Sequence, residues 1–399
     1  MNGSPSRVLL WPFSVLYGAG SALRNLMFDA GWLRSFAFDF PVIVVGNLQA
    51  GGTGKTPCVE YLVRKLSERY AVAVLSRGYG RNTRGYLLAG PEATADDIGD
   101  EPLLLKRLHP SLELAVGEQR VPAIPALLTD APQVEVIVCD DAFQHRPLRG
   151  GFNLLLTGYD KLYIDDAMLP AGRLRESVSG ARRAQAIVVT GCPSDLSEVI
   201  RQDVTRRLRV RGDQPVYFAG SVYGQPYKLG HPANFSEGDV AGLDASSVPG
   251  ALKVPVEGVA QGGRPDQPLR LVLLTGIARS GRVKQALESG AVAADTGALP
   301  PIVSVTHLSY PDHHIWQSRD LERLRRVYAR EAAAGPCIIL TTEKDAVRLD
   351  AHASALADLP VYVLPVRMQI PFGAEAAFDA MLLRYVEGAL ARQDKVSAG

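Results

Sequence analysis

The sequence is short of cysteine and of net charge. Its four cysteines lie far apart and share no Cys-x-x-Cys spacing, which argues against a zinc site or a disulfide framework and favours buried thiols. The formal net charge of the 399 residues is only +1, so no overall field attracts a polyanion such as DNA. We therefore expect no nucleic-acid partner, and no protein partner is evident from the sequence.

The N-terminal region is apolar but lacks a run of membrane-spanning length. The run at residues 8–17 is shorter than the roughly 20 residues that cross a bilayer. Small residues follow it at 18–22, as in signal peptides, but the buried strand pattern at residues 42–45 and the glycine-rich loop after it argue against secretion. Apolar residues then recur at helical spacing from Leu16 to Phe38. Two interpretations stay open: a helix packed on the core, or one lying in the membrane interface with its tryptophans at headgroup depth.

Short apolar runs alternate with helical patterns along the rest of the chain. This alternation is typical of an α/β fold with a mainly parallel sheet flanked by helices. Buried strands are expected near residues 42–45, 72–75, 134–139, 152–156, 186–190, 270–274, 302–305, 338–341 and 361–366, and helices of the second half near 280–289, 318–333 and 373–392.

One long segment interrupts this rhythm. Residues 222–268 are rich in glycine, proline, serine and aspartate, and we expect an interlobe connection there, either a β-ribbon or a mobile loop. The expected division is residues 1–40 for N-terminal helices, 41–221 for a P-loop core lobe, 222–268 for the connection, 269–392 for a second, smaller α/β lobe and 393–399 for a tail.

A glycine-rich loop separates the first buried strand from an apolar pattern of helical period. Its residues are Gly51, Gly52, Thr53, Gly54, Lys55 and Thr56. Glycines let successive backbone N–H groups face phosphate oxygens at the helix N-terminus. Lys55 can reach the β- and γ-phosphates, and the Thr56 hydroxyl can ligate Mg²⁺. The full Walker A pattern asks for glycine where this chain has Gln49. The flanking strand and helix nevertheless favour nucleotide binding over an incidental glycine turn.

Several acidic residues stand where a phosphate-transfer site needs them. Asp140 and Asp141 directly follow the strand at 134–139, and a carboxylate beside a phosphate loop is a usual Mg²⁺ ligand. The alternative is a pair of solvated turn residues. Asp100 opens a helical pattern, where a simple N-cap is also possible. His313 stands beside a carboxylate, which suits a catalytic pair, a metal site or a structural histidine.

Taken in order, these motifs resemble the tetraacyldisaccharide 4'-kinase family, also called lipid A 4'-kinase. The matching motifs are Leu16-Tyr17-Gly18 with Arg24-Asn25, Val45-Gly46-Asn47-Leu48, the loop 51–57, Leu75-Ser76-Arg77-Gly78-Tyr79-Gly80-Arg81, Gly99-Asp100-Glu101-Pro102, Val116-Gly117 with Arg120, Asp140-Asp141 with Phe143-Gln144-His145-Arg146, Pro170-Ala171-Gly172-Arg173-Leu174-Arg175-Glu176, Gly276-Ile277-Ala278, Asp312-His313-His314 and Thr342-Glu343-Lys344-Asp345. The chain departs from the family pattern at Ala142, Pro147 and Trp316, and residues 231–268 are longer than expected.

The resemblance implies transfer of the γ-phosphoryl of ATP to the 4'-hydroxyl of a lipid-linked glucosamine disaccharide 1-phosphate. It implies that Lys55 and Thr56 serve the phosphates and Mg²⁺, with Asp140, Asp141 and Glu101 as further metal ligands. It also implies that Asp100 accepts the hydroxyl proton with His313 oriented against it. Candidates for the sugar and its phosphate are Tyr79, Arg81, Arg173, Arg175 and Glu176.

The same resemblance favours the membrane interpretation of the N-terminal helices, residues 1–40. It implies a peripheral location on the cytoplasmic face of the bacterial inner membrane, where the lipid acceptor lies. Two other classes of P-loop protein remain to be weighed. A partitioning-type or regulatory ATPase usually has lysine before the two glycines, where this chain has Ala50. A GTPase would need Asn-Lys-x-Asp, which Glu343-Lys344-Asp345 does not match.

Overall fold

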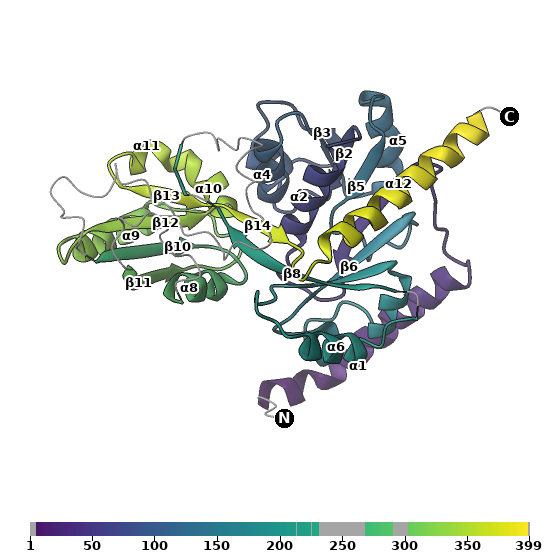
Figure 1. Cartoon of the computed structure of the whole chain (residues 1–399), viewed down its shortest axis with the longest axis horizontal. Coiled ribbons are helices and arrows are strands. Elements are labelled where there is room, and N and C mark those ends of the chain that lie inside the picture. Colours follow the sequence, from purple (N-terminus) through teal and green to yellow (C-terminus); the bar gives the residue numbers. More distant parts are fainter. Residues whose placement is uncertain (1–4, 213, 225, 231–267, 290–301, 398–399) are drawn as a thin grey trace.

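The computed structural model describes residues 5–212, 214–224, 226–230, 268–289 and 302–397. They form two lobes, each built on its own sheet (Figure 1). The predicted α/β class, with a mainly parallel sheet flanked by helices and a second, smaller lobe, is confirmed. The predicted interlobe segment lies largely outside the described residues.

The first lobe contains a nine-stranded sheet in the order β14-β8-β7-β6-β1-β5-β2-β4-β3. Its strands are β1 Val42–Asn47, β2 Val72–Ser76, β3 Leu87–Leu88, β4 Glu113–Val116, β5 Val136–Cys139, β6 Phe152–Gly158, β7 Ala186–Thr190, β8 Val216–Tyr223 and β14 Val366–Gln369. β1 lies at the centre and pairs in parallel with β5 and β6. The loops that follow these three strands therefore meet at one edge of the sheet, the edge where ligands bind in such folds.

Helices cover both faces of this sheet. α2 Lys55–Leu66, α4 Asp100–Leu108 and α12 Glu375–Ser397 pack on one face, and α5 Arg120–Asp130 and α6 Glu198–Arg207 pack on the other. Each face carries alternate side chains of the same strands, as the period of two in a strand requires. The short α3 Ala95–Ile98 precedes α4.

The second lobe contains a five-stranded sheet in the order β11-β10-β12-β13-β9. Its elements are β9 Tyr227–Lys228, β10 Leu269–Thr275, α8 Ser280–Glu288, β11 Ile302–Ser309, α9 Ser318–Ala332, β12 Cys337–Thr342, α10 Glu343–Leu349, α11 Ala353–Leu356 and β13 Val361–Leu364. The central strands pair in parallel, and β9 alone among the described strands of this sheet runs antiparallel to its neighbour.

The chain returns to the first lobe before it ends, which differs from the expected lobe boundary at residue 392. β14 pairs with β8, and α12 buries Phe378, Leu382 and Val386 in the first-lobe core. The hydroxyl of Tyr385 also bonds both backbone groups of Val42 at 3.0 and 3.1 Å. The apolar pattern of α12 was correct, but a pattern says nothing about which sheet will cover it.

α1 Pro5–Asp29 forms a single helix on the outside of the first lobe (Figure 1). Its polar and small side chains face the protein. Ser14 donates to the carbonyl of Met168 at 3.0 Å, Ser21 to that of Arg175 at 3.3 Å, and Asn25 to a carboxylate of Glu176 at 2.9 Å. The apolar side is left exposed, so α1 is not packed on the core by its apolar residues. Among the described residues, no helix combines the length and apolarity needed to cross a membrane.

Candidate active site

The glycine-rich loop has a backbone that only glycine adopts without strain. Gly51 and Gly54 have φ angles of 101° and 80°, in the left-handed region that side chains disfavour. Asn47 donates to the hydroxyl of Thr53 at 2.6 Å, and the hydroxyl of Thr190 donates to the Thr53 carbonyl at 2.8 Å. These buried bonds fix the loop at the start of α2, with its N–H groups available to phosphate.

Gln49, at the position where the Walker A pattern asks for glycine, is part of this scaffold. Its side chain is buried and donates to a carboxylate oxygen of Asp166 at 3.0 Å. On either side of it the backbone pairs with the segment around Arg173 and Arg175, through bonds of 2.7 and 2.8 Å. At this position the chain therefore has a glutamine whose hydrogen bonds support the start of the phosphate loop, in place of the glycine of the motif.

Asp140 and Asp141 follow β5 and lie beside the loop. Lys55 is 3.6 Å from Asp141, and Arg175 is 3.5 Å from the other oxygen of the same carboxylate. Burial alone would raise the pKa of Asp141, but the charges of Lys55 and Arg175 outweigh it and hold the pKa below its usual value. Asp141 is therefore a charged partner for the loop lysine.

Asp140 is different, because it is almost fully buried. One oxygen accepts from the hydroxyl of Ser76 at 3.2 Å, while the other has no partner among the described residues. Burial first, and then the negative charges of Glu101 and Asp141, raise its pKa to about 7. A buried carboxylate in this state is stabilised by a nearby cation.

These residues fit Mg²⁺. Groups of three or more histidine, cysteine or acidic side chains of metal-binding geometry are absent from the described part of the chain. Mg²⁺ bound with a nucleotide does not need such a cage, because it keeps waters and uses one or two carboxylates together with phosphate oxygens. The free oxygen of Asp140 and the hydroxyl of Thr56 would hold the ion, which would neutralise phosphate charge there.

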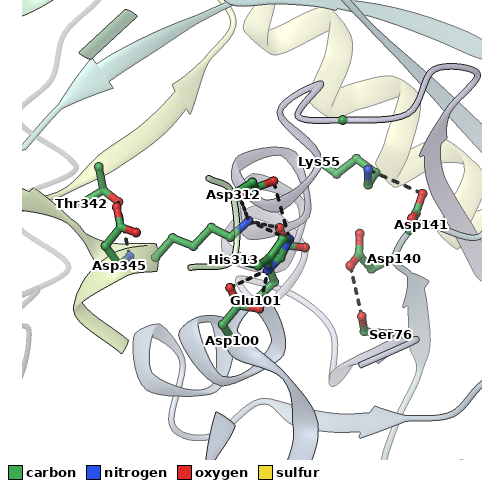
Figure 2. A network of polar contacts seen from close by, with 12 residues as sticks. Lys55, Ser76, Asp100, Glu101, Asp140, Asp141, Asp312, His313, Thr342 and Asp345 are labelled. Carbon is green, nitrogen blue, oxygen red and sulfur yellow. Dashed lines mark hydrogen bonds and ion pairs between the residues drawn. The ribbon is translucent and has the colours of Figure 1, made fainter. Parts of the chain in front are cut away.

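The second lobe brings His313 against Asp100 (Figure 2). Nδ1 of His313 lies 3.0 and 3.2 Å from the two carboxylate oxygens, and Arg348 lies 2.8 Å from one of them. A carboxylate only accepts hydrogen bonds, so Nδ1 carries the hydrogen in its contact with Asp100. A nitrogen of Arg348 lies 3.0 Å from the same Nδ1, and Nε2 lies 3.4 Å from Lys344. The expected contact across the lobes is present, whereas the N-cap interpretation of Asp100 has no bond to support it.

The charges around Asp100 keep it ionised. Burial alone would raise its pKa, but the hydrogen bond with His313 and the positive charges of Lys344 and Arg348 outweigh burial and lower the pKa. Lys344 also reaches Glu101 at 2.7 Å. A carboxylate that is ionised, buried and held by its neighbours can accept a proton from a hydroxyl placed against it.

The phosphate loop with Asp140 and the Asp100–His313 pair line one cleft between the lobes, which has a volume of about 830 Å³. Lys55 and Asp140 stand on its first-lobe wall, and His313 comes from the second lobe (Figure 2). The cleft therefore joins a phosphate-binding loop to a carboxylate–imidazole pair, which is the arrangement that phosphoryl transfer to a hydroxyl requires.

The family is decided by comparison with known proteins. Residues 6–387 match the model of the tetraacyldisaccharide-1-P 4'-kinase family. The chain belongs to this family. It is therefore a kinase, and the resemblance inferred from the sequence is confirmed.

Relatives within the 4'-kinase family match along nearly their whole length. The tetraacyldisaccharide 4'-kinase of Bacteroides thetaiotaomicron is 40% identical over 380 residues, covering 94% of this chain and 92% of the relative. That of Flavobacterium johnsoniae is 36% identical over 386 residues, covering 96% and 97%. The crystal structure of LpxK from Aquifex aeolicus in complex with ATP superposes with a TM-score of 0.65 at 25% identity, covering 95% of this chain and 99% of that one.

The structure does not bring every residue expected from the 4'-kinase resemblance into the cleft. Tyr79 and Arg175 line it, and the ring of Tyr79 lies 5.0 Å from that of His313. Arg81 does not, because its side chain is only 3% exposed and pairs with Glu118 at 2.6 Å. The prediction that Arg81 stands in a loop after a strand is correct. Its side chain, however, donates to the carbonyl of Gly85 in that same loop and stabilises it.

Glu176 and Arg173 are likewise outside the cleft lining. Glu176 is buried and accepts two bonds from Arg183, at 2.7 and 2.9 Å, so its role here is to anchor α1 and the neighbouring turn. Arg173 is half exposed and lies 3.5 Å from Asp166. Both residues brace the segment that supports the phosphate loop.

Two groups of basic residues in or beside the cleft of this 4'-kinase have no role predicted from the sequence. Lys344 and Arg348 surround the Asp100–His313 pair. Arg279 and Arg282, at the start of α8, line the cleft from the second lobe. Lys344 stands in one of the matching motifs and follows β12 after one residue, whereas the only signal for Arg279 is that it follows the end of β10 after three residues.

Proposed function

We propose that this chain transfers the γ-phosphoryl of ATP to the 4'-hydroxyl of a tetraacylated glucosamine disaccharide 1-phosphate, which yields the 4'-phosphorylated lipid A precursor. The observation that carries the proposal is the contact between Asp100 and His313 in the same cleft as Lys55 and Asp140. The family supplies the acceptor, and the solved relative with ATP supports ATP as the donor.

The donor phosphates and the acceptor hydroxyl would be served by different groups. Lys55 and the N–H groups of the loop would bind the phosphates. Asp140 and Thr56 would hold Mg²⁺, which would supply positive charge against the phosphate oxygens. Asp100 would take the hydroxyl proton while His313 holds its orientation. Oxygen of the sugar then forms the new bond to phosphorus, and ADP leaves.

Arg175 is the best placed residue for the sugar or its phosphate. It lines the cleft, lies 3.5 Å from Asp141 and belongs to the segment on which α1 rests. Tyr79 also lines the cleft and lies against His313. A head group lying between them would present its hydroxyl to Asp100.

A direct assay separates this function from that of a regulatory ATPase. We expect formation of a 4'-phosphorylated lipid, and ADP release that rises strongly when the tetraacyl disaccharide 1-phosphate is added in detergent. Mass spectrometry of the lipid and a coupled ADP assay measure the two products. ADP release of equal rate with and without the lipid, and no phosphorylated lipid, would favour the ATPase.

The outer surface of α1 supports a peripheral position on the membrane. Leu9, Leu16 and Leu23 recur at intervals of seven residues and are 77%, 71% and 57% exposed. Trp32, just after the helix, is 78% exposed. An apolar stripe of this kind, opposite a polar face that bonds to the protein, is suited to the lipid interface. We propose that it lies in the cytoplasmic leaflet of the inner membrane, where the acyl chains of the acceptor remain.

Charged substitutions on this stripe are expected to weaken membrane binding. The double variant Leu9→Glu with Leu16→Glu should lose roughly a hundredfold or more in vesicle affinity, because each buried leucine contributes about 1.5–3 kcal/mol. Co-sedimentation with vesicles of phosphatidylethanolamine and phosphatidylglycerol measures the loss. Val199→Glu, on the exposed surface of α6, is the matched control, and a truncation starting at Asp39 should lose binding altogether. Unchanged co-sedimentation of the double variant would show that α1 does not meet lipid.

A further inference from the structure

Two arginines of the second lobe reach across the cleft to the first lobe. Arg279 lies 2.8 Å and Arg282 lies 2.7 Å from the same oxygen of Asp160. Arg279 and Arg282 stand at the start of α8, and Asp160 follows the end of β6. The contact therefore joins the two walls of the cleft at the edge where the phosphate loop lies.

The arginines are in contact with the surroundings of that loop. A Cβ built on Gly52 would come within 3.0 Å of Ala278, the residue before Arg279. The guanidinium of Arg282 lies on Gly191, where a Cβ would be only 1.8 Å from its nitrogen. Gly191 follows Thr190, whose hydroxyl bonds the loop at Thr53. Both side chains thus lie at the mouth of the phosphate site.

Asp160 alone does not balance the positive charge of Arg279 and Arg282. Two guanidinium groups share one carboxylate oxygen, and that carboxylate is 51% exposed whereas Arg279 is largely buried. Burial first, and then the positive charges of Arg282 and Arg173, lower the pKa of Arg279. An exposed ion pair contributes little to holding two lobes together. The site is therefore better suited to a ligand with several negative charges than to a single aspartate.

We propose that Arg279 and Arg282 bind the phosphate chain of ATP from the second-lobe wall, and that Asp160 holds them when no nucleotide is present. This rests on the proposed function. A guanidinium presents a planar fork of donors that matches phosphate oxygens. On ATP binding the two side chains exchange Asp160 for phosphate, opposite Lys55. Positive charge then surrounds the phosphates from both lobes, and the second lobe is fixed with His313 at Asp100.

If the proposal is correct, the arginine variants weaken nucleotide binding and the Asp160 variant does not. Arg279→Gln and Arg282→Gln should each weaken binding of a non-hydrolysable ATP analogue by roughly tenfold to a hundredfold, the range for a lost bond to a charged group. The KM for ATP should rise with them while the KM for the lipid changes little. Asp160→Asn removes the competing carboxylate and should leave analogue affinity unchanged or tighter. Arg325→Gln, which breaks an ion pair with Asp358 elsewhere in the second lobe, is the control.

Calorimetric titration of the full-length protein with the analogue and Mg²⁺ decides the question without lipid. If Asp160→Asn weakens binding as much as the arginine variants do, the three residues form only an interlobe tether and the proposal is overturned. Analogue affinity that is unchanged in both arginine variants overturns it as well. The wild-type protein could also fail to phosphorylate the lipid while the folded arginine variants still lose analogue affinity. That result would refute the proposed acceptor, but the nucleotide contact would stand.

Discussion

Replacing Lys55 with alanine is expected to lower kcat by roughly 100- to 1,000-fold, the usual effect of removing one preorganised donor from developing charge. Lys55 stands at the first position of α2, after a loop whose backbone is fixed by buried hydrogen bonds, and its amine is 3.6 Å from Asp141. That carboxylate offers the amine a partner until phosphate arrives. Steady-state kinetics with the lipid acceptor measures the loss.

Lys65→Ala is the matched control for this substitution. Lys65 lies on the same helix but pairs with Glu375 and Asp379 of α12, at 3.3 and 3.5 Å, away from the cleft. Its removal should leave kcat near the wild-type value. Circular dichroism and thermal melting should show both variants folded. Turnover close to wild type in folded Lys55→Ala would remove the phosphate-loop assignment.

Local patterns in the sequence were sufficient for the elements that build the site. The strand at 42–45 and the loop 51–56 were placed correctly because an apolar run, positive-φ glycines and a helical period are properties of neighbouring residues. The contact between Asp100 and His313 could not come from such patterns, since 213 positions separate the residues. It was expected only because the order of motifs resembled a known family.

The features that the sequence could not predict all depend on packing between residues that lie far apart in the chain. The sequence could not show that α12 would return to the first sheet, because an apolar helical period does not say which core the helix will cover. Nor could it show that Arg81 would be buried against Glu118, or that Lys344 would meet Glu101 across the cleft. Each of these depends on which loops face one another, and charge at a strand end alone does not reveal its partner.

The surroundings of α1 also could not be predicted from the sequence alone. Its spacing predicted a helix, and two environments remained open for its apolar residues. What separates them is the polar side, where Ser14, Ser21 and Asn25 bond to the segment around residues 168–176. Since the protein occupies the polar face, the apolar residues are left outside, and only tertiary structure could show this.

Asp100→Ala and His313→Ala are each expected to depress kcat with little change in ATP affinity. Asp100→Ala should cost roughly 100- to 10,000-fold, the range for general base catalysis. The double variant should be little worse than Asp100→Ala alone, because His313 acts through Asp100, and residues that act as one unit are not additive. The nearby pair of His314 and Asp320, joined at 2.8 Å outside the cleft lining, provides the control.

His314→Ala tests whether any aspartate–histidine pair of this lobe matters equally. Asp320 caps α9 through the backbone of Gln317, so loss of His314 should lower stability more than it lowers kcat. Asp100→Asn keeps the shape of the side chain while removing its basicity, and it should remain as inactive as Asp100→Ala if the carboxylate is the base. Full additivity of the Asp100 and His313 losses would separate the two roles. Wild-type kcat in Asp100→Asn would show that the proton leaves by another route, because an amide cannot accept it.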